Sequence, residues 1–185
     1  MKFFIIIWSI WFLSEILLNR FLRSGKNIKN DRDKGTIRII WITLVIAISL
    51  GVVIATFLRA PIGTTIIIPY VGLILIVFGI IFRFISIWTL GRLFTVDVTI
   101  RDKHTIKRDG VYRFVRHPSY SGSIVSFIGL GISLNNWISV IVISIPVIIA
   151  MLNRIKIEEK LLTDQFGDEY LDYMKKTYRL IPWIY

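Results

Sequence analysis

Charged residues are missing from three long stretches of this chain. Residues Ile39–Leu58, Pro61–Phe82 and Pro118–Asn153 contain 20, 22 and 36 residues without Asp, Glu, Lys or Arg. About 20 apolar residues cross the hydrocarbon core of a bilayer as an α-helix. Phe3–Leu18 is a further apolar segment, shorter than the others, with Glu15 as its one charge. This pattern predicts a polytopic membrane protein built from helices.

The 36-residue block is too long for one crossing, because a single helix of that length would reach about 54 Å. Asn135-Asn136 lies near its middle and predicts a turn. We therefore expect a hairpin of two helices, Pro118–Leu134 and Trp137–Asn153, the first short enough to enter the membrane and return. The predicted fold class is all-α, with about five transmembrane helices of which the last two form the hairpin.

Beyond the hairpin the pattern becomes amphipathic. The last spanning helix is expected to continue through Arg154–Gln165 and to stop at Phe166-Gly167. A short amphipathic helix should follow, with Asp168 as its N-cap. The apolar tail, residues 180–185, is suited to the membrane interface. We expect one domain, 1–185, made of a three-span part (1–90) and a second part (91–185) that holds the polar segment, the hairpin and the tail.

Basic residues are distributed unevenly over the loops. The chain has 23 Lys+Arg against 12 Asp+Glu, a net charge of +11. Seven basic residues fall in 20–38, one (Arg59) follows the second span, seven fall in 92–116 and six follow Asn153. Cytoplasmic loops are enriched in Lys and Arg, so the N-terminus is expected outside and the C-terminus in the cytoplasm. The small size of the chain and its lack of targeting signals favour a prokaryotic inner membrane. This distribution favours anionic membrane lipids as partners over nucleic acid.

The composition limits the chemistry. The chain has no cysteine, which excludes disulfides, thiol catalysis and iron–sulfur clusters, and its two histidines, His104 and His117, do not form a close pair. No metal site is therefore expected. Both histidines precede the hairpin, in a polar segment that could form a site, although ordinary loop histidines would look the same.

Two charged groups flank the predicted hairpin. Proline suits the first position of a helix, so a helix should begin at Pro118 with free N–H groups beside Arg116 and His117, an arrangement that can bind an anion. On the other side, Arg154 and Glu158 are four residues apart and share one helical face. The alternatives are a basic collar that anchors a span and a solvated helix extension.

Glu15 and Arg83 lie inside apolar segments, close to their predicted cytoplasmic ends. Charges within a membrane are candidates for function, but side chains this close to an end can also reach the headgroups. We expect at most a supporting role for the pair.

Four segments in the second half of the chain form an ordered pattern: Asp109–Gly122, with the run Arg116-His117-Pro118-Ser119-Tyr120, then Glu158–Leu162, Phe166–Tyr173 and Ile181-Pro182. This pattern resembles the isoprenylcysteine carboxyl methyltransferase family, to which phospholipid methyltransferases are related. The resemblance implies a cofactor-binding methyltransferase part in 91–185 and S-adenosylmethionine (SAM) as cofactor. It implies cofactor contacts at His104, Thr105, Ile106, Lys107, Tyr112, His117, Pro118, Ser119, Tyr120 and Glu158, and a substrate-positioning arginine at Arg154.

These residues also have the chemistry that SAM requires. A basic helix N-terminus can hold its carboxylate, Glu158 can accept from its ribose or its amine, and a ring of Tyr112 or Tyr120 can face the sulfonium. A carboxylate acceptor needs no general base and only alignment by Arg154. A hydroxyl or an amine needs a base, for which His117 is the candidate. The expected acceptor is a lipid-like or prenylated molecule at the cytoplasmic face.

Two other function classes remain open from the sequence. A membrane NADPH-dependent reductase of the sterol-reductase type has a similar basic–His–Pro–aromatic signature. Those reductases share an Asn before the Tyr and an acidic residue after the following Gly, whereas this chain has Ser119 and Ser123 at these two positions. A non-catalytic membrane subunit or small transporter would explain the apolar blocks, but not the convergence of His117, Arg154 and Glu158. The sequence leaves the oligomeric state open.

Overall fold

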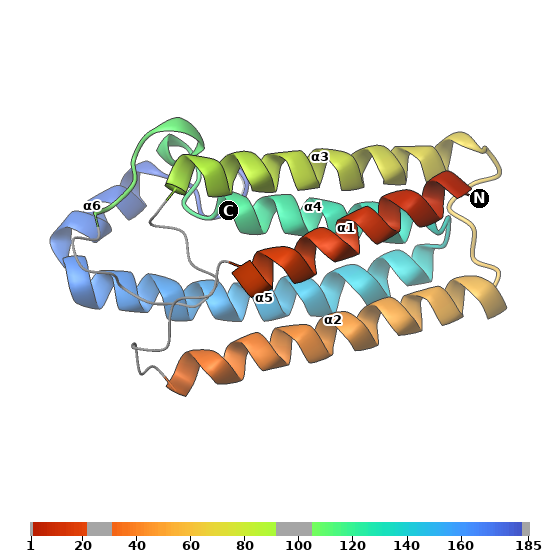
Figure 1. Ribbon diagram of the computed structural model, residues 1–185, viewed down its shortest axis with the longest axis horizontal. Coiled ribbons are helices and arrows are strands. Elements are labelled where there is room, and N and C mark those ends of the chain that lie inside the picture. The colour runs from red at the N-terminus through yellow and green to blue at the C-terminus, as the bar shows by residue number, and fades with distance from the viewer. Residues whose placement is uncertain (1, 22–30, 92–104, 183–185) are drawn as a thin grey trace.

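Five long helices run side by side and alternate in direction (Figure 1). The computed structural model describes residues 2–21, 31–91 and 105–182. The long helices are α1 (Lys2–Phe21), α2 (Asp31–Phe57), α3 (Ile67–Leu90), α4 (Pro118–Ser133) and α5 (Trp137–Phe166). A 3-10 turn, η2 (Gly110–Arg113), and a short helix, α6 (Asp168–Lys176), lie at one end of the bundle. The predicted all-α class is confirmed.

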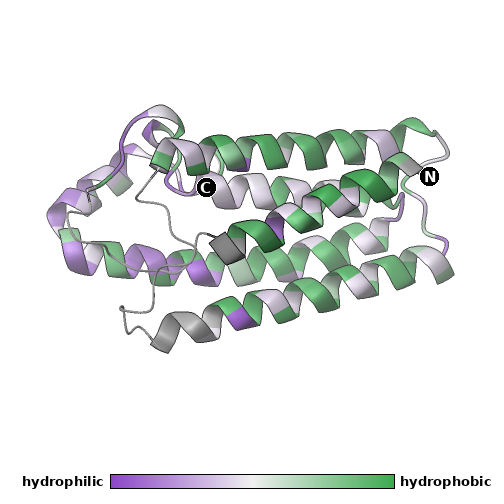
Figure 2. Ribbon diagram, viewed as in Figure 1, coloured by the Kyte–Doolittle hydropathy of each residue, from purple (hydrophilic) through white to green (hydrophobic). Residues whose placement is uncertain are grey.

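Length and composition let three of these helices cross a membrane. They are α3, α5 and the segment Ile37–Phe57 of α2, and Phe3–Leu18 of α1 is a shorter apolar helix. Large apolar side chains cover the outer faces, with Phe57 83% and Trp88 85% exposed. Apolar residues line the length of the bundle, whereas polar residues gather at the end that carries α6 (Figure 2). The chain is an integral, multi-pass membrane protein.

The predicted hairpin is confirmed as α4 and α5. Asn135 adopts a positive φ of 48° in the turn between them. Asn136 caps α5, because its side chain accepts from the backbone N–H groups of Ile138 and Ser139. The same two asparagines donate to carbonyls of the α2–α3 connection, Asn136 to Leu58 at 2.7 Å and Asn135 to Gly63 at 3.0 Å. The apolar end of the bundle is thereby tied together.

Glycines let α3 and α4 approach closely. Gly79 on α3 faces Gly122 on α4. Seven residues further along each helix, Gly72 on α3 faces Gly129 on α4. A Cβ added at Gly79 would lie 2.5 Å from the Gly122 carbonyl oxygen, and one at Gly129 would lie 2.7 Å from that of Gly72. Small residues at such positions are the usual means of close helix packing in membranes. This contact fixes where α4 begins relative to α3.

Gly167 rather than Asp168 separates α5 from α6. Its φ of 53° lies in the left-handed region that favours glycine, and its N–H donates to the Thr163 carbonyl at 2.8 Å. Its own carbonyl accepts from Tyr170 at 3.1 Å, so Gly167 caps both helices. The expectation that Asp168 is the N-cap was wrong, because α5 passes into α6 without a linker and Asp168 is already the first helical residue.

The tail packs against the start of α4. Tyr178 forms a parallel bridge with Val115, and the Arg116 N–H donates to the Tyr178 carbonyl at 2.8 Å. The Ser121 hydroxyl donates to the Leu180 carbonyl at 2.6 Å, and Leu180 is buried in the core. Leu180 is therefore covered by the protein itself, and the interfacial position of the tail stays a prediction. Residues 183–185 of the expected tail lie outside the described residues.

Candidate active site

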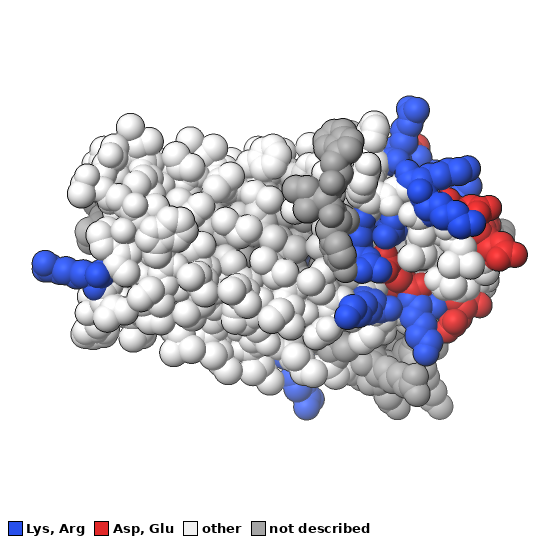
Figure 3. All heavy atoms as spheres, turned by 180° about the vertical axis from the view of Figure 1, so that it is seen from behind, with Lys and Arg blue, Asp and Glu red and all other residues white. Residues whose placement is uncertain are grey.

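Charged side chains gather at the end of the bundle where α4 begins (Figure 3). There α5 extends past its apolar part, and its first charge is Arg154. The turn η2 packs against α3 and helix α6 packs against α5. Side chains from the start of α4 and from the polar turns of α5 can therefore meet at this end, beside the tail.

Tyr120 links the two α5 residues that the sequence singled out. The Arg154 Nε donates to the Tyr120 hydroxyl at 3.0 Å, and this hydroxyl donates to the Glu158 carboxylate at 3.1 Å. Arg154 and Glu158 lie one helical turn apart, as their spacing predicts, and both face α4. Arg154 is buried, whereas the Glu158 side chain is 31% exposed. The Glu158 carboxylate can therefore be reached by a ligand.

His117 lies between two carboxylates. Its Nδ1 is 3.9 Å from Glu158, and its Nε2 is 3.3 Å from Glu159. The imidazole is 4% exposed, and its ring centroid lies 5.8 Å from that of Tyr120. Among the described residues, no group of three or more His, Cys, Asp or Glu could hold a metal ion.

Glu159 forms ion pairs with arginines of two segments, the one before α4 and the tail. Its carboxylate accepts from Arg116 Nε at 3.0 Å and from the Arg179 guanidinium at 2.7 Å. Arg116 also donates to the carbonyls of Met174 and Thr177. Sequence reasoning missed Glu159 and Arg179 as parts of this cluster. The acidic pair 158–159 was a signal for Glu159, but no local pattern indicates the long-range contact of Arg179.

The start of α4 follows the predicted geometry only in part. Pro118 is the first helical residue and is buried, as is Ser119. The backbone N–H groups of Tyr120 and Ser121 donate to the His117 carbonyl, so they close the first turn rather than point at a ligand. The Arg116 guanidinium faces Glu159 and the tail, so the expectation that it stands beside a free helix N-terminus was wrong.

The segment before η2 has mixed contacts. His104 lies outside the described residues. Thr105 is exposed, Ile106 is half-buried, and Lys107 pairs with Asp109 at 3.1 Å.

Tyr112 on η2 is buried and holds two elements together. Its hydroxyl donates to the Ser86 carbonyl of α3 at 3.3 Å, and its own carbonyl accepts from the Tyr173 hydroxyl at 2.6 Å. Burial raises the pKa of the Tyr112 hydroxyl well above its usual value, and the charge of Glu158 raises it further. Tyr112 is therefore a hydrogen-bond donor at every physiological pH.

The two intramembrane charges pair with each other. Arg83 on α3 lies 3.3 Å from Glu15 on α1, and its guanidinium also donates to Ser123 on α4. The two charged side chains are 16% and 12% exposed. The pair therefore joins α1, α3 and α4, one turn along α4 from Ser119.

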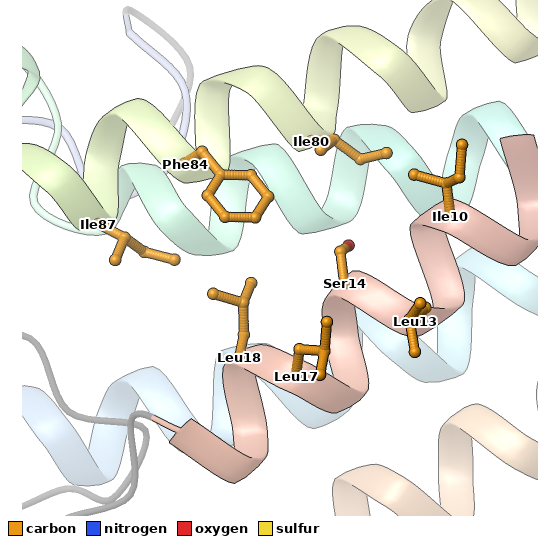
Figure 4. Close-up of a pocket in the computed structure, with 8 residues that line it drawn as sticks. All are labelled: Ile10, Leu13, Ser14, Leu17, Leu18, Ile80, Phe84 and Ile87. Carbon is orange, nitrogen blue, oxygen red and sulfur yellow. The ribbon is translucent and has the colours of Figure 1, made fainter.

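An apolar groove lies between α1 and α3 (Figure 4). Its volume is about 550 Å³, and side chains such as Leu17 and Leu18 of α1 and Ile80 and Phe84 of α3 line it. Among the described residues that line the groove, Ser14 is the polar one. A groove of this composition suits a hydrocarbon chain.

Comparison with known proteins identifies relatives of this arrangement. The family model of isoprenylcysteine carboxyl methyltransferases matches residues 72–164, which cover α4, most of α3 and most of α5. A probable protein-S-isoprenylcysteine O-methyltransferase of Oryza sativa subsp. indica is 34% identical over 119 residues, which are 63% of this chain and 62% of that protein. The rat protein-S-isoprenylcysteine O-methyltransferase is 36% identical over 115 residues, 61% of this chain and 40% of its own.

A solved structure extends the likeness to the whole bundle. The eukaryotic intramembrane Ras methyltransferase superimposes with a TM-score of 0.64 over 96% of this chain and 64% of its own, at 23% identity. That identity supports the fold alone, and the matched segments span less than two thirds of the rice relative's length. The family model nevertheless covers half of the chain, including the residues that surround Tyr120. The protein therefore belongs to the isoprenylcysteine carboxyl methyltransferase family.

Proposed function

We propose that this protein is a SAM-dependent methyltransferase that methylates a carboxylate of a lipid-like or prenylated substrate at the cytoplasmic membrane face. The observation that carries the proposal is the connected set Arg154, Tyr120, Glu158 and His117 at the polar end of apolar helices. The set lies within the segment that the family model matches. The names of the relatives supply the substrate class, an isoprenylated cysteine with a free carboxylate.

The side chains of this site have the chemistry that SAM requires. SAM supplies an electrophilic methyl group on a sulfonium. The partly exposed Glu158 carboxylate can accept from the hydroxyls or the amine of the cofactor, and the Tyr120 ring can face a cation. The further proposed contacts are His104, Thr105, Ile106, Lys107, Tyr112, His117, Pro118 and Ser119.

The acceptor chemistry is assigned to Arg154. Its guanidinium is buried and held by Tyr120, so it can fix a carboxylate in one orientation next to the cofactor site. A carboxylate is already ionised at neutral pH and needs no base. A hydroxyl or an amine acceptor would need a base, and His117 is the side chain in place for that role.

The membrane arrangement belongs to the same proposal. We propose that all five long helices span the bilayer, with the N-terminus outside and the C-terminus in the cytoplasm of a prokaryotic cell. The distribution of Lys and Arg supports this orientation. We treat residues 1–185 as one domain, because α3 packs on α4 and α2 packs on α5 across its two parts.

Calorimetry in detergent tests the cofactor. SAM or its demethylated product should bind in the micromolar range, and NADPH should release no heat. Purified protein incubated with labelled SAM and native lipid extract should then yield a labelled lipid-like product. Heat from NADPH together with none from SAM would instead favour the reductase class.

A further inference from the structure

Glu159 lies behind the proposed site rather than in it. Its side chain is 6% exposed, against 31% for Glu158 on the preceding position of α5. Its carboxylate contacts His117, Arg116 and Arg179, which come from the segment before α4 and from the tail. A group this enclosed does not touch a ligand directly, but it can decide how its neighbours are held.

The contact between Glu159 and His117 defines the protonation of the ring. A carboxylate that faces two guanidinium groups has no proton to donate, so it accepts from His117 Nε2. Nε2 then carries a hydrogen whether the imidazole is neutral or charged. The other nitrogen, Nδ1, faces Glu158 at 3.9 Å. Any proton that His117 gains or loses is therefore on Nδ1, the nitrogen on the side of the proposed site.

We propose that Glu159 is a positioning residue for methyl transfer: it keeps a hydrogen on His117 Nε2 and orients Nδ1 toward Glu158 and Tyr120. The effect of Glu159 on methyl transfer rests on the proposed function, whereas its effect on the His117 ring does not. The tail helps to hold Glu159 in place, because Arg179 and Arg116 bind its carboxylate. Arg116 also binds the carbonyls of Met174 and Thr177. His117 is the N-cap residue of α4, so the start of that helix fixes its backbone. The contact with Glu159 then sets the orientation of the ring.

The protonation of His117 can be observed directly by NMR. The chain has two histidines, so protein labelled with ¹⁵N-histidine gives two ring systems, and a His104→Gln variant assigns them. Long-range ¹H–¹⁵N correlation in detergent micelles distinguishes a ring with a hydrogen on Nε2 from one with a hydrogen on Nδ1. The expected result is that Nε2 of His117 carries a hydrogen in the folded protein and that Nδ1 is the nitrogen without one in the neutral ring.

Substitutions of Glu159 separate positioning from folding. Glu159→Gln offers both an acceptor and a donor, so His117 should become a mixture of tautomers and the single-turnover rate should fall roughly tenfold, as for other outer partners that orient a histidine. Glu159→Asp keeps an ionised acceptor and should retain the Nε2 hydrogen. Asp172→Asn, which removes an exposed carboxylate paired with Lys175, is the matched control and should change nothing.

The outcomes decide between the two proposals. His117 without a hydrogen on Nε2 in the unsubstituted protein, or an unchanged tautomer in Glu159→Gln, overturns the positioning role. If Glu159→Gln does not fold, the unsubstituted protein and Glu159→Asp still decide it. An Nε2 hydrogen in a protein that transfers no methyl group would leave the ring orientation in place and overturn the proposed function instead.

Discussion

At the residue scale, Tyr120 couples the two side chains to which we assign different roles. Its hydroxyl accepts from Arg154 and donates to Glu158, so the residue proposed to align the acceptor and the residue proposed to hold the cofactor share one oxygen. The coupling helps to explain why a buried arginine is tolerated at the end of an apolar helix, since its Nε–H donates to Tyr120. The two roles should nevertheless be separable by one substitution that keeps the shape of Glu158 and another that keeps the charge of Arg154.

Glu158→Gln and Arg154→Lys are expected to fail in different ways. Glu158→Gln removes the charged acceptor, so SAM affinity should fall by about 1.5–3 kcal/mol. Arg154→Lys keeps the charge but loses the planar donor fork, so SAM binding should be nearly retained while the single-turnover rate drops. Cofactor titration and single-turnover measurements on both variants check this. Equal, mild losses in both quantities would mean that the two residues form only a solvated helix extension.

The sequence predicted part of this site because that part is local. Arg154 and Glu158 are one turn apart, and Pro118 marks the start of a helix, so both features follow from helical geometry. The roles of Glu159 and Arg179 depend on how the tail returns to the start of α4, which no periodicity records. Arg116 was placed on the right segment, but its direction was missed for the same reason.

At the scale of elements, paired glycines set the distance between α3 and α4. Gly72 and Gly79 on one helix and Gly122 and Gly129 on the other have the same seven-residue spacing, and they face each other in antiparallel order. The hairpin of α4 and α5 could be predicted from the asparagines within one apolar block. The pairing of α3 with α4 could not, because the glycine spacing has a meaning only once the two helices are placed side by side.

Gly79→Ala should destabilise the bundle, because its Cβ would lie 2.5 Å from the Gly122 carbonyl oxygen. Separating two packed backbones is expected to cost about 1–3 kcal/mol. The matched control is Gly35→Ala on α2, where an added Cβ meets nothing within 4 Å and the helix should be unchanged or slightly more stable. Thermal unfolding in detergent compares the two, and equal midpoints would show that α3 and α4 are not held by this contact.

At the scale of the whole molecule, charge is separated along the bundle axis. The polar end carries α6, η2 and the proposed site, whereas the opposite end carries the α2–α3 connection (Figure 1), in which Arg59 is the one charged residue. The apolar groove between α1 and α3 lies along the bundle between these ends. A site at the polar end and a groove along the membrane-facing side suit a substrate with an ionised head and a hydrocarbon tail.

The orientation of the bundle predicts where its ends lie. A reporter fused after Tyr185 should behave as cytoplasmic, and one fused before Met1 should behave as external, because Lys and Arg concentrate in 20–38, in 92–116 and after Asn153, and basic loops usually stay in the cytoplasm. Fusions at both ends of one protein measure this in cells. External activity of the C-terminal reporter would place the proposed site on the wrong side of the membrane for a cytoplasmic cofactor.

Transfer of a labelled methyl group from SAM to a prenylated cysteine with a free carboxylate tests the account most directly. The purified protein should form a product whose label is released by base as methanol, as expected of a methyl ester, and the same acceptor with its carboxylate converted to an amide should stay unlabelled. A base-stable product would move the chemistry to a hydroxyl or an amine acceptor and to His117 as base. No transfer to any acceptor by a folded protein with SAM bound would contradict the assignment of methyl transfer to this site.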